Sequence, residues 1–230
     1  MSVRVVPYPD RAAEMAGLAE TVARELAAAL EDKGRASLAV PGGTTPGPFL
    51  TALSGVDLDW ARIDVMLTDE RFVPPTSERS NTRLLKETLF RDRAACAALV
   101  PLFADVETPE AAVAELSSDV SAALPLDVCV LGMGADMHTA SLFPGADRLK
   151  EALDPETDAI LMSMRADGAG EPRITLTVRV LRAAANLHVL IAGEEKKHAL
   201  ERAMAGTDWS EAPVRAVLSA PTSVTVHYAD

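Results

Sequence analysis

Short, mostly apolar runs alternate with amphipathic segments along nearly the whole chain. Runs bounded by charged or turn-forming residues predict β-strands, and they occur at 3–6, 36–40, 63–67, 127–131, 160–164, 187–192 and 223–228. The segment 173–177 also looks extended. Apolar residues that recur every three or four positions predict helices, and they occupy about 15–30, 46 onward, 80–90, 109–123 and 194 onward.

The alternation of strands and helices predicts the fold class. It favours an α/β protein with a Rossmann-like, mostly parallel sheet covered by helices on both faces. Asp10 and Ser80 are placed to cap two of the helices, and Gly34 is placed to end the first. The chain contains no internal repeat, low-complexity tract or linker. We therefore expect a single domain over residues 1–230.

The amino-acid composition disfavours two classes of protein, those that bind nucleic acid and those that span membranes. The chain has 230 residues with a net charge of −12, which disfavours binding to nucleic acid through its phosphates. No apolar run is long enough to span a bilayer, and the start of the chain lacks the apolar region of a signal peptide. These features predict a soluble cytoplasmic protein that does not interact with membranes. The sequence carries no signal for its oligomeric state.

The cysteines and most histidines do not suggest a metal site. Cys96 and Cys129 lack the spacing of metal ligands, and Cys129 reads as a small core residue. His188 lies in an apolar strand and is expected to be a hydrogen-bonded core residue. No two histidines have ligand spacing, so we expect no metal site.

Asp136 and His138 follow a predicted strand and a glycine turn. The carboxyl ends of strands carry the chemistry of open α/β sheets, and histidine transfers protons near neutral pH. A carboxylate two residues away can fix the tautomer of the imidazole and stabilise its protonated form. We interpret His138 as a general base oriented by Asp136.

Three other segments place polar groups at strand ends. Gly42, Gly43, Thr44 and Thr45 lie between a strand and a helix, where backbone N–H groups attract phosphate. The same residues also suit a simple tight turn with a threonine cap. Asp69, Glu70 and Arg71 follow the strand 63–67, where Asp69 and Glu70 could orient Arg71 or hydrogen-bond sugar hydroxyls. Arg173 and Lys196 lie near later strand ends. Each charged group also suits an exposed surface, but together the cations suit a phosphate pocket.

Several well-known motifs are incomplete or absent. The run from Gly132 to Met137 resembles the dinucleotide motif GxGxxG, but Met137 replaces its third glycine. The turn at 42–45 lacks the lysine of a Walker-type phosphate loop. No GxSxG segment occurs, so a hydrolase with a serine nucleophile elbow is not supported.

Taken in order, the polar segments resemble the 6-phosphogluconolactonase family. The matching blocks are specific as an ordered set, although each is weak alone, and they lie at 42–45, 69–71, 80–81, 132–144, 172–175, and 193 with 196. The family often has a glycine where this chain has Met137. If that position has a positive φ, the methionine is strained there.

The resemblance implies hydrolysis of 6-phospho-D-glucono-1,5-lactone to 6-phosphogluconate in the pentose phosphate pathway, without metal or cofactor. It implies that His138 activates water and that Asp136 holds His138. The cations Arg71, Lys196 and Arg173 and the amides at 43–45 would bind the 6-phosphate.

Two alternatives carry different functions. Glucosamine-6-phosphate isomerase/deaminases share the fold, but their His is followed by Ile-Ala-Phe-Asn-Glu-Pro, whereas here Phe143 replaces that Glu. A phenylalanine cannot transfer the proton needed for ring opening. A non-catalytic sugar-phosphate sensor would retain the phosphate site, but such domains usually follow a basic DNA-binding segment. No such segment precedes the fold in this sequence.

Overall fold

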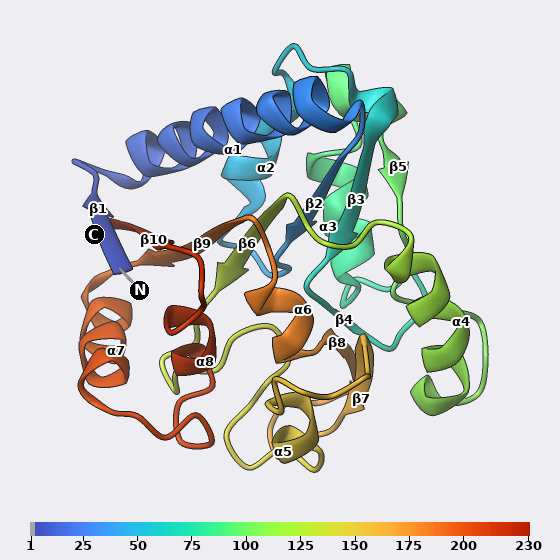
Figure 1. The fold of residues 1–230 in the computed structure, drawn as a ribbon, viewed down its shortest axis with the longest axis vertical. Helices are drawn as coiled ribbons and strands as arrows, with labels where there is room; N and C mark the ends of the chain where they lie inside the picture. Colours follow the sequence, from blue (N-terminus) through green and yellow to red (C-terminus); the bar gives the residue numbers. More distant parts are fainter. Residues whose placement is uncertain (1–2) are drawn as a thin grey trace.

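The computed structural model describes residues 3–230 and places a parallel β-sheet at its centre (Figure 1). The strand order is β1-β10-β9-β6-β2-β3-β5, and every neighbouring pair is parallel. The strands are β1 (Val3–Pro7), β2 (Ala36–Val40), β3 (Ile63–Leu67), β5 (Ala98–Leu99), β6 (Val128–Gly132), β9 (Asn186–Ala192) and β10 (Val224–Ala229). The prediction of an α/β fold with a mostly parallel sheet is confirmed.

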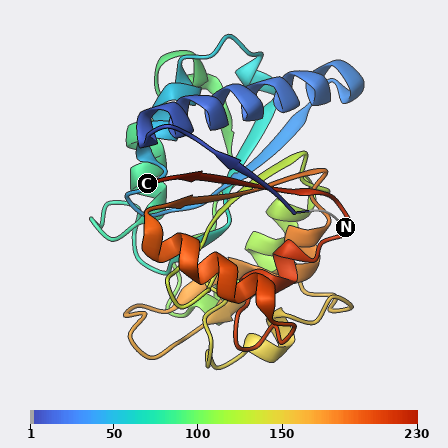
Figure 2. The ribbon, with the colours of Figure 1, turned by 90° about the vertical axis from the view of Figure 1, so that its left-hand side faces the viewer.

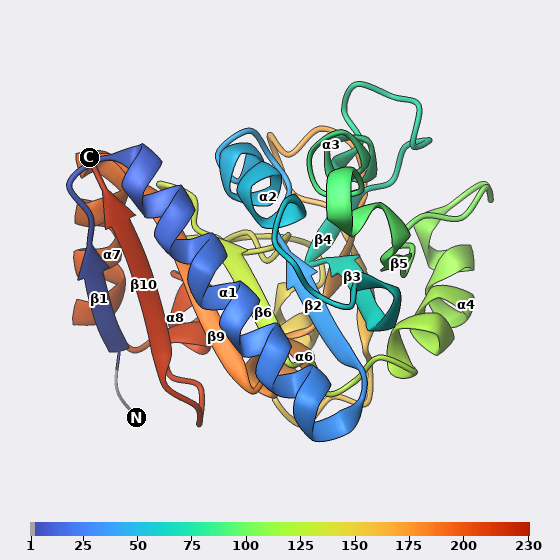
Figure 3. The same ribbon diagram turned by 90° about the horizontal axis from the view of Figure 1, so that it is seen from above.

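Helices cover both faces of this sheet. The long helix α1 lies across one face and α7 lies on the other, as the side view makes clear (Figure 2). Seen from above, α1 crosses the strands diagonally (Figure 3). The helices are α1 (Arg11–Lys33), α2 (Gly47–Ser54), α3 (Asn81–Thr88), α4 (Pro109–Ser121), α5 (Leu149–Ala152), α6 (Val178–Arg182), α7 (Glu194–Ala205) and α8 (Val214–Leu218), with 3-10 turns at Trp60–Arg62 and Asp92–Cys96.

The predicted ends of α1 are confirmed, although the helix is longer than its clearest periodic segment. The Asp10 side chain accepts a hydrogen bond from the Ala13 amide at 2.8 Å, and Gly34 ends the helix with a φ of 71°. The buried face includes Leu18, Val22 and Leu26, all fully buried. Packing of this apolar stripe on the sheet, rather than helix propensity alone, therefore holds α1 in place.

A second, smaller sheet was not anticipated. Strands β4 (Asp69–Arg71), β8 (Arg173–Leu176) and β7 (Leu161–Met164) pair antiparallel in the order β4-β8-β7. The sequence predicted strands at 160–164 and 173–177, but it did not separate them from the main sheet. Only long-range pairing distinguishes the two sheets, because strand periodicity is the same in both.

The core confirms two predictions about single residues. Cys129 is completely buried in β6. His188 is buried in β9, where its Nδ1 lies 3.1 Å from His227 Nε2 and its Nε2 lies 2.7 Å from Glu25 Oε2. His188 is thus a hydrogen-bonded core residue.

None of the helices between residues 3 and 230 is long and apolar enough to cross a membrane.

Strand order also places the functional end of the sheet. From β2 the chain proceeds to β3 and β5 on one side, whereas from β6 it proceeds to β9 and β10 on the other. The direction therefore reverses between the adjacent strands β2 and β6. In open α/β sheets, ligands bind at the carboxyl ends of the strands beside such a reversal.

Candidate active site

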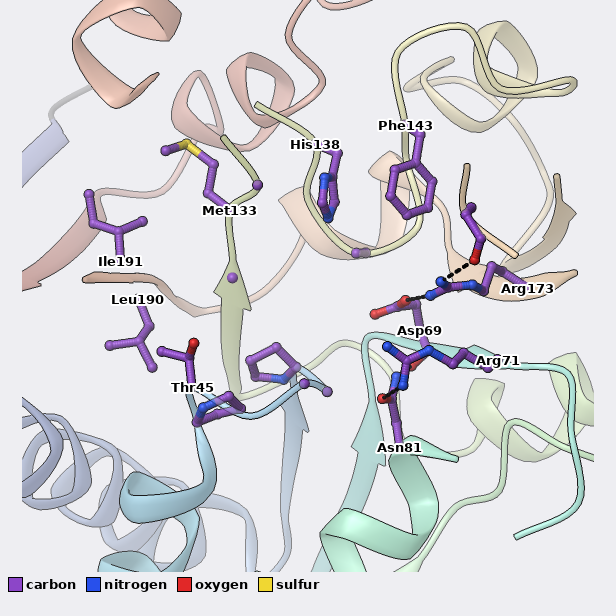
Figure 4. Close-up of a pocket in the computed structure, with 18 of the residues that line it drawn as sticks. Thr45, Asp69, Arg71, Asn81, Met133, His138, Phe143, Arg173, Leu190 and Ile191 are labelled. Atoms are coloured by element: carbon purple, nitrogen blue, oxygen red, sulfur yellow. Dashed lines mark hydrogen bonds and ion pairs between the residues drawn. The ribbon is translucent and has the colours of Figure 1, made fainter. Parts of the chain in front are cut away.

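A pocket of about 410 Å³ opens at this point (Figure 4). This volume suits a small ligand. Its walls come from the segments after β2 and β6, from the end of β9, and from the small sheet. The lining residues include Gly42, Gly43, Thr45, Asp69, Arg71, Arg79, Asn81, Met133, Gly134, His138, Phe143, Arg173, Ile191 and Lys196. Segments far apart in the sequence therefore meet in one cavity.

His138 projects into the pocket from the turn after β6 (Figure 4). Its Nδ1 lies 2.6 Å from Asp136 Oδ1, and the same oxygen accepts from the His138 amide at 3.2 Å. A proton on Nδ1 donates to the carboxylate, so Nε2 is left with a lone pair for proton transfer. Partial burial acts to raise the pKa of Asp136, but the charge and hydrogen bonds of His138 outweigh burial and lower it.

The backbone of this turn is tightly closed. A Cβ at Gly134 would lie 2.1 Å from His138 Nδ1 and 2.2 Å from Asp136 Oδ1, so only glycine fits. Met137 has a φ of 66°, in the left-handed region that suits glycine or asparagine. The anticipated strain at Met137 is therefore present.

The glycine–threonine turn contributes in two ways. Gly43 has a φ of 86° and open space where a Cβ would lie. Gly42 makes room for a neighbour instead, because a Cβ there would lie 2.0 Å from Asn81 Cγ. Thr45 lines the pocket, whereas Thr44 is exposed and lies outside the lining of the pocket in the described chain. Binding of substrate by Thr44 stays a prediction without a supporting contact.

Two arginines face each other across the small sheet. Arg71 on β4 is paired directly with Arg173 on β8. Each has a buried Nε with no hydrogen-bond partner between residues 3 and 230. Like charges directly opposite each other are unfavourable, and buried donors without partners are costly. An anion bound between the guanidinium groups would reduce the repulsion between the two charges.

The surroundings hold these arginines in position. Arg71 Nη1 donates to the Arg79 carbonyl at 2.7 Å and to Asn81 Oδ1 at 3.2 Å. Asp69 lies 3.7 Å from Arg173 and accepts from Ser141 Oγ at 2.5 Å. Burial lowers the pKa of Arg173, Asp69 opposes this effect, and Arg71 adds to it. Arginine nevertheless stays charged, so the pair presents a positive wall.

Phe143 lies between the His138 imidazole and the Arg173 side chain (Figure 4). Its ring centroid is 4.3 Å from that of His138, and the Arg173 guanidinium lies 5.6 Å from it on the other side. The Phe143 ring therefore packs against both His138 and Arg173 and limits the space available to these two side chains.

Lys196 and Glu70 have roles that the sequence did not reveal. Lys196 lines the pocket, but its Nζ already donates to the Met133 carbonyl at 2.6 Å. Glu70 is completely buried and lies outside the pocket. Its carboxylate accepts from Ser80 Oγ and from the amides of Asn81 and Thr82, so it caps α3 rather than contacting a sugar.

Sequence reasoning assigned no role to two lining residues, Asn81 and Arg79. Asn81 belongs to a block that resembles the lactonase family, but only its contact with Arg71 explains it. Nothing in the sequence pattern distinguishes Arg79 from other surface arginines.

Between residues 3 and 230, no group of three or more His, Cys, Asp or Glu side chains is arranged to hold a metal ion. The expectation of a site without metal or cofactor stays a prediction.

Comparison with known proteins identifies the relatives of this chain. A curated 6-phosphogluconolactonase from Rhizobium meliloti (strain 1021) is 49% identical over 219 residues, covering 95% of this chain and 94% of the relative. One from Pseudomonas aeruginosa is 44% identical over 220 residues, covering 94% and 91%. A crystal structure of a 6-phosphogluconolactonase from Shewanella baltica OS155 superposes with a TM-score of 0.97 at 32% identity, covering 100% of this chain and 98% of that one.

The fold is also shared more widely. The structure of a monomeric glucosamine-6-phosphate deaminase has a TM-score of 0.76 at 15% identity, which shows a common fold only. The family model for glucosamine-6-phosphate isomerases/6-phosphogluconolactonase matches residues 9–227 of this chain. On this match and on relatives that align along almost its full length, the chain belongs to the glucosamine-6-phosphate isomerase/6-phosphogluconolactonase family.

Proposed function

We propose that this protein hydrolyses 6-phospho-D-glucono-1,5-lactone to 6-phospho-D-gluconate, a step of the pentose phosphate pathway, in the cytoplasm. The lactonase relatives support this assignment. The observation that carries it is that one pocket contains an imidazole with one free nitrogen, next to Asp136, and a facing pair of arginines. A phosphorylated lactone matches this arrangement, because its ester carbonyl would react beside the imidazole and its phosphate dianion would bind to the arginines.

The imidazole supplies the proton transfers. Nε2 of His138 removes a proton from a water molecule that attacks the lactone carbonyl. The protonated ring then donates a proton to the ring oxygen as the C–O bond breaks. Asp136 holds the Nδ1 proton and stabilises the imidazolium between the two steps. Lactones hydrolyse slowly unaided, so this catalysis, worth about 10²–10⁴-fold, requires no covalent intermediate.

The arginines bind the phosphate. Arg71 and Arg173 both line the pocket, and their guanidinium groups offer charged N–H donors to a phosphate. Asp69, Gly42 and Gly43 line the same pocket, and we assign them to the sugar. Lys196 retains two further N–H donors beyond its contact with Met133, and we assign it to the substrate as well.

The deciding experiment is a pH-stat assay on freshly prepared lactone, with wild type and His138→Ala side by side. We expect His138→Ala to lower kcat by about 10²–10⁴-fold and to leave KM within a few-fold, because only proton transfer is removed. A variant that retains the wild-type kcat would exclude His138 from the reaction.

Arg71→Ala tests the phosphate pocket. Removing one of two facing arginines is expected to raise KM by at least about tenfold, because the charge-assisted bond to phosphate is lost. The matched control is Arg83→Ala on α3, whose guanidinium contacts Glu87 outside the pocket. An unchanged KM for the Arg71 variant would place the phosphate elsewhere.

The same assays separate the alternatives. Phe143 stands beside His138 where a deaminase would require a proton-transferring group. Release of ammonia from glucosamine 6-phosphate would nevertheless establish the deaminase function. Tight binding of the phosphosugar without turnover would indicate a sensor. A sensor does not need the proton transfer that we assign to Asp136 and His138.

A further inference from the structure

The turn that carries Asp136 and His138 is held by residues of the C-terminal helices α7 and α8. Three alternate carbonyls of the turn accept hydrogen bonds from this region. Met133 O accepts from Lys196 Nζ at 2.6 Å, Ala135 O from Arg202 Nη2 at 3.0 Å, and Met137 O from the Val214 amide at 3.1 Å. We call these three bonds the carbonyl clamp. α7 and α8, which provide the donors, lie side by side (Figure 1).

The clamp acts on a segment that stores strain. A left-handed conformation at a residue such as Met137 persists only when surrounding contacts enforce it. Within the turn, the Met137 amide donates to Gly134 O at 3.0 Å and the Gly134 amide donates to His138 O at 2.9 Å. The turn is therefore closed from within by these bonds and fixed from outside by the clamp.

A relaxed turn would move the proton-transfer pair directly. Asp136 lies between two clamped carbonyls, and the His138 ring packs against Gly134 with no room for a methyl group. Any rotation of the peptides at 135–137 therefore changes the direction of Nε2. A displacement of about 1 Å is enough to lower a rate substantially.

From this geometry we infer that Arg202 is a positioning residue for the reaction. It lines no part of the pocket, and its exposed guanidinium acts through the Ala135 carbonyl. Lys196 is less suited to reveal this role, because it also lines the pocket, and Val214 contributes only a backbone amide. The inference rests on the proposed lactonase function for its kinetic test only.

The test is a double-mutant cycle of Arg202→Met and Met137→Gly. Arg202→Met retains the apolar stem and removes the donor. We expect it to lower kcat about tenfold with KM unchanged, because the pair is misdirected while the phosphate pocket is intact. In the Met137→Gly background the same change should cost about threefold or less, since glycine adopts a positive φ without external support.

Two controls isolate the clamp. Arg179→Met removes another exposed arginine that donates to backbone carbonyls, those of Thr157 and Asp158, and it should leave kcat and KM unchanged. Arg202→Lys retains a cationic donor and should recover part of the lost kcat. Thermal unfolding of each variant verifies that the fold is intact.

Amide hydrogen exchange provides a readout that needs no turnover. The Met137 and Gly134 amides should exchange faster in Arg202→Met than in wild type, whereas amides of α1 should not change. If wild type fails to hydrolyse the lactone, the proposed function is wrong, and exchange still decides the role of Arg202. Unchanged exchange together with an unchanged kcat, or an equal loss in both backgrounds of the cycle, would overturn the inference.

Discussion

Gly134 lies so close behind the imidazole that its missing side chain is part of the site. The carboxylate of Asp136 and the ring of His138 both occupy the space where a Cβ would be. Neighbouring glycines serve other purposes: Gly42 leaves room for Asn81, and Gly43 supports a positive φ. Close approach and backbone conformation are thus separate reasons for glycine within one pocket.

Gly134→Ala is predicted to reduce kcat by about 100-fold, because the added methyl group must push the His138 ring out of line. KM should change much less, since the arginines lie on the other wall. Steady-state kinetics on the lactone measure both constants. Gly55→Ala is the control, because a Cβ there meets nothing closer than 3.8 Å. A Gly134 variant with normal turnover would mean that the pair tolerates displacement.

Helix α3 connects the buried carboxylate of Glu70 to Arg71, which lines the proposed phosphate site. The Glu70 carboxylate accepts from the amides of Asn81 and Thr82 at 2.8 and 2.7 Å, and from Ser80 Oγ at 3.1 Å. These groups form the first turn of the helix, where free N–H donors and the helix dipole favour an anion. The cap fixes Asn81, and Asn81 in turn holds Arg71.

Glu70→Gln is predicted to lower the free energy of unfolding by about 2–3 kcal/mol, because the amide is neutral and one of its atoms cannot accept a hydrogen bond. KM should rise as well, since Arg71 loses its support. Urea denaturation and lactone kinetics measure the two effects. Glu87→Gln on the exposed face of the same helix should change stability by less than about 0.5 kcal/mol. Equal effects for both variants would refute the capping role.

Across the protein, the packing of α1 on the sheet buries one carboxyl group without a partner. Neither carboxylate oxygen of Glu14 has a hydrogen bond to any residue from 3 to 230, and the residue is completely buried. Burial raises the pKa of Glu14 to about 7, although Arg11 opposes the effect. The folded protein therefore keeps this proton at pH values where the unfolded chain has lost it.

Stability is predicted to decrease as pH rises through the range between the ordinary pKa of 4.5 and about 7, because the folded state binds the extra proton there. Glu14→Gln removes this dependence. At pH 8 it should raise the free energy of unfolding by up to about 3 kcal/mol, and at pH 4.5 it should have little effect. Urea denaturation at both pH values tests this, with Glu20→Gln as the exposed control on α1. The same gain at both pH values would contradict it.

The boundaries of the elements were largely predictable, and the partners of the strands were not. The Asp10 and Ser80 caps and the end at Gly34 were recognised because each depends on a few adjacent residues. The short helices α5 and α8 were missed, since a single turn shows little periodicity. That residues 1–230 form a single domain stays a prediction, as does the absence of nucleic-acid partners.

The candidate site also has features that were predictable from the sequence and features that were not. The Asp136–His138 pair was recognisable because two residues within one turn must be neighbours. Three contacts join segments tens of residues apart and were not predictable. They are the pairing of Arg71 with Arg173, the approach of the Arg173 guanidinium to the Phe143 ring, and the bond from Arg202 to Ala135.

Most of the local order in this protein, meaning its longer strands, the ends of its first helix and its glycine turns, was determined by the sequence alone. Steric limits and hydrophobic periodicity act over a few residues. Tertiary structure decided which charges face each other, which carboxylate is buried as a cap, and what supports the strained turn. Those outcomes depend on how distant segments pack in three dimensions, and no spacing along the chain encodes them directly.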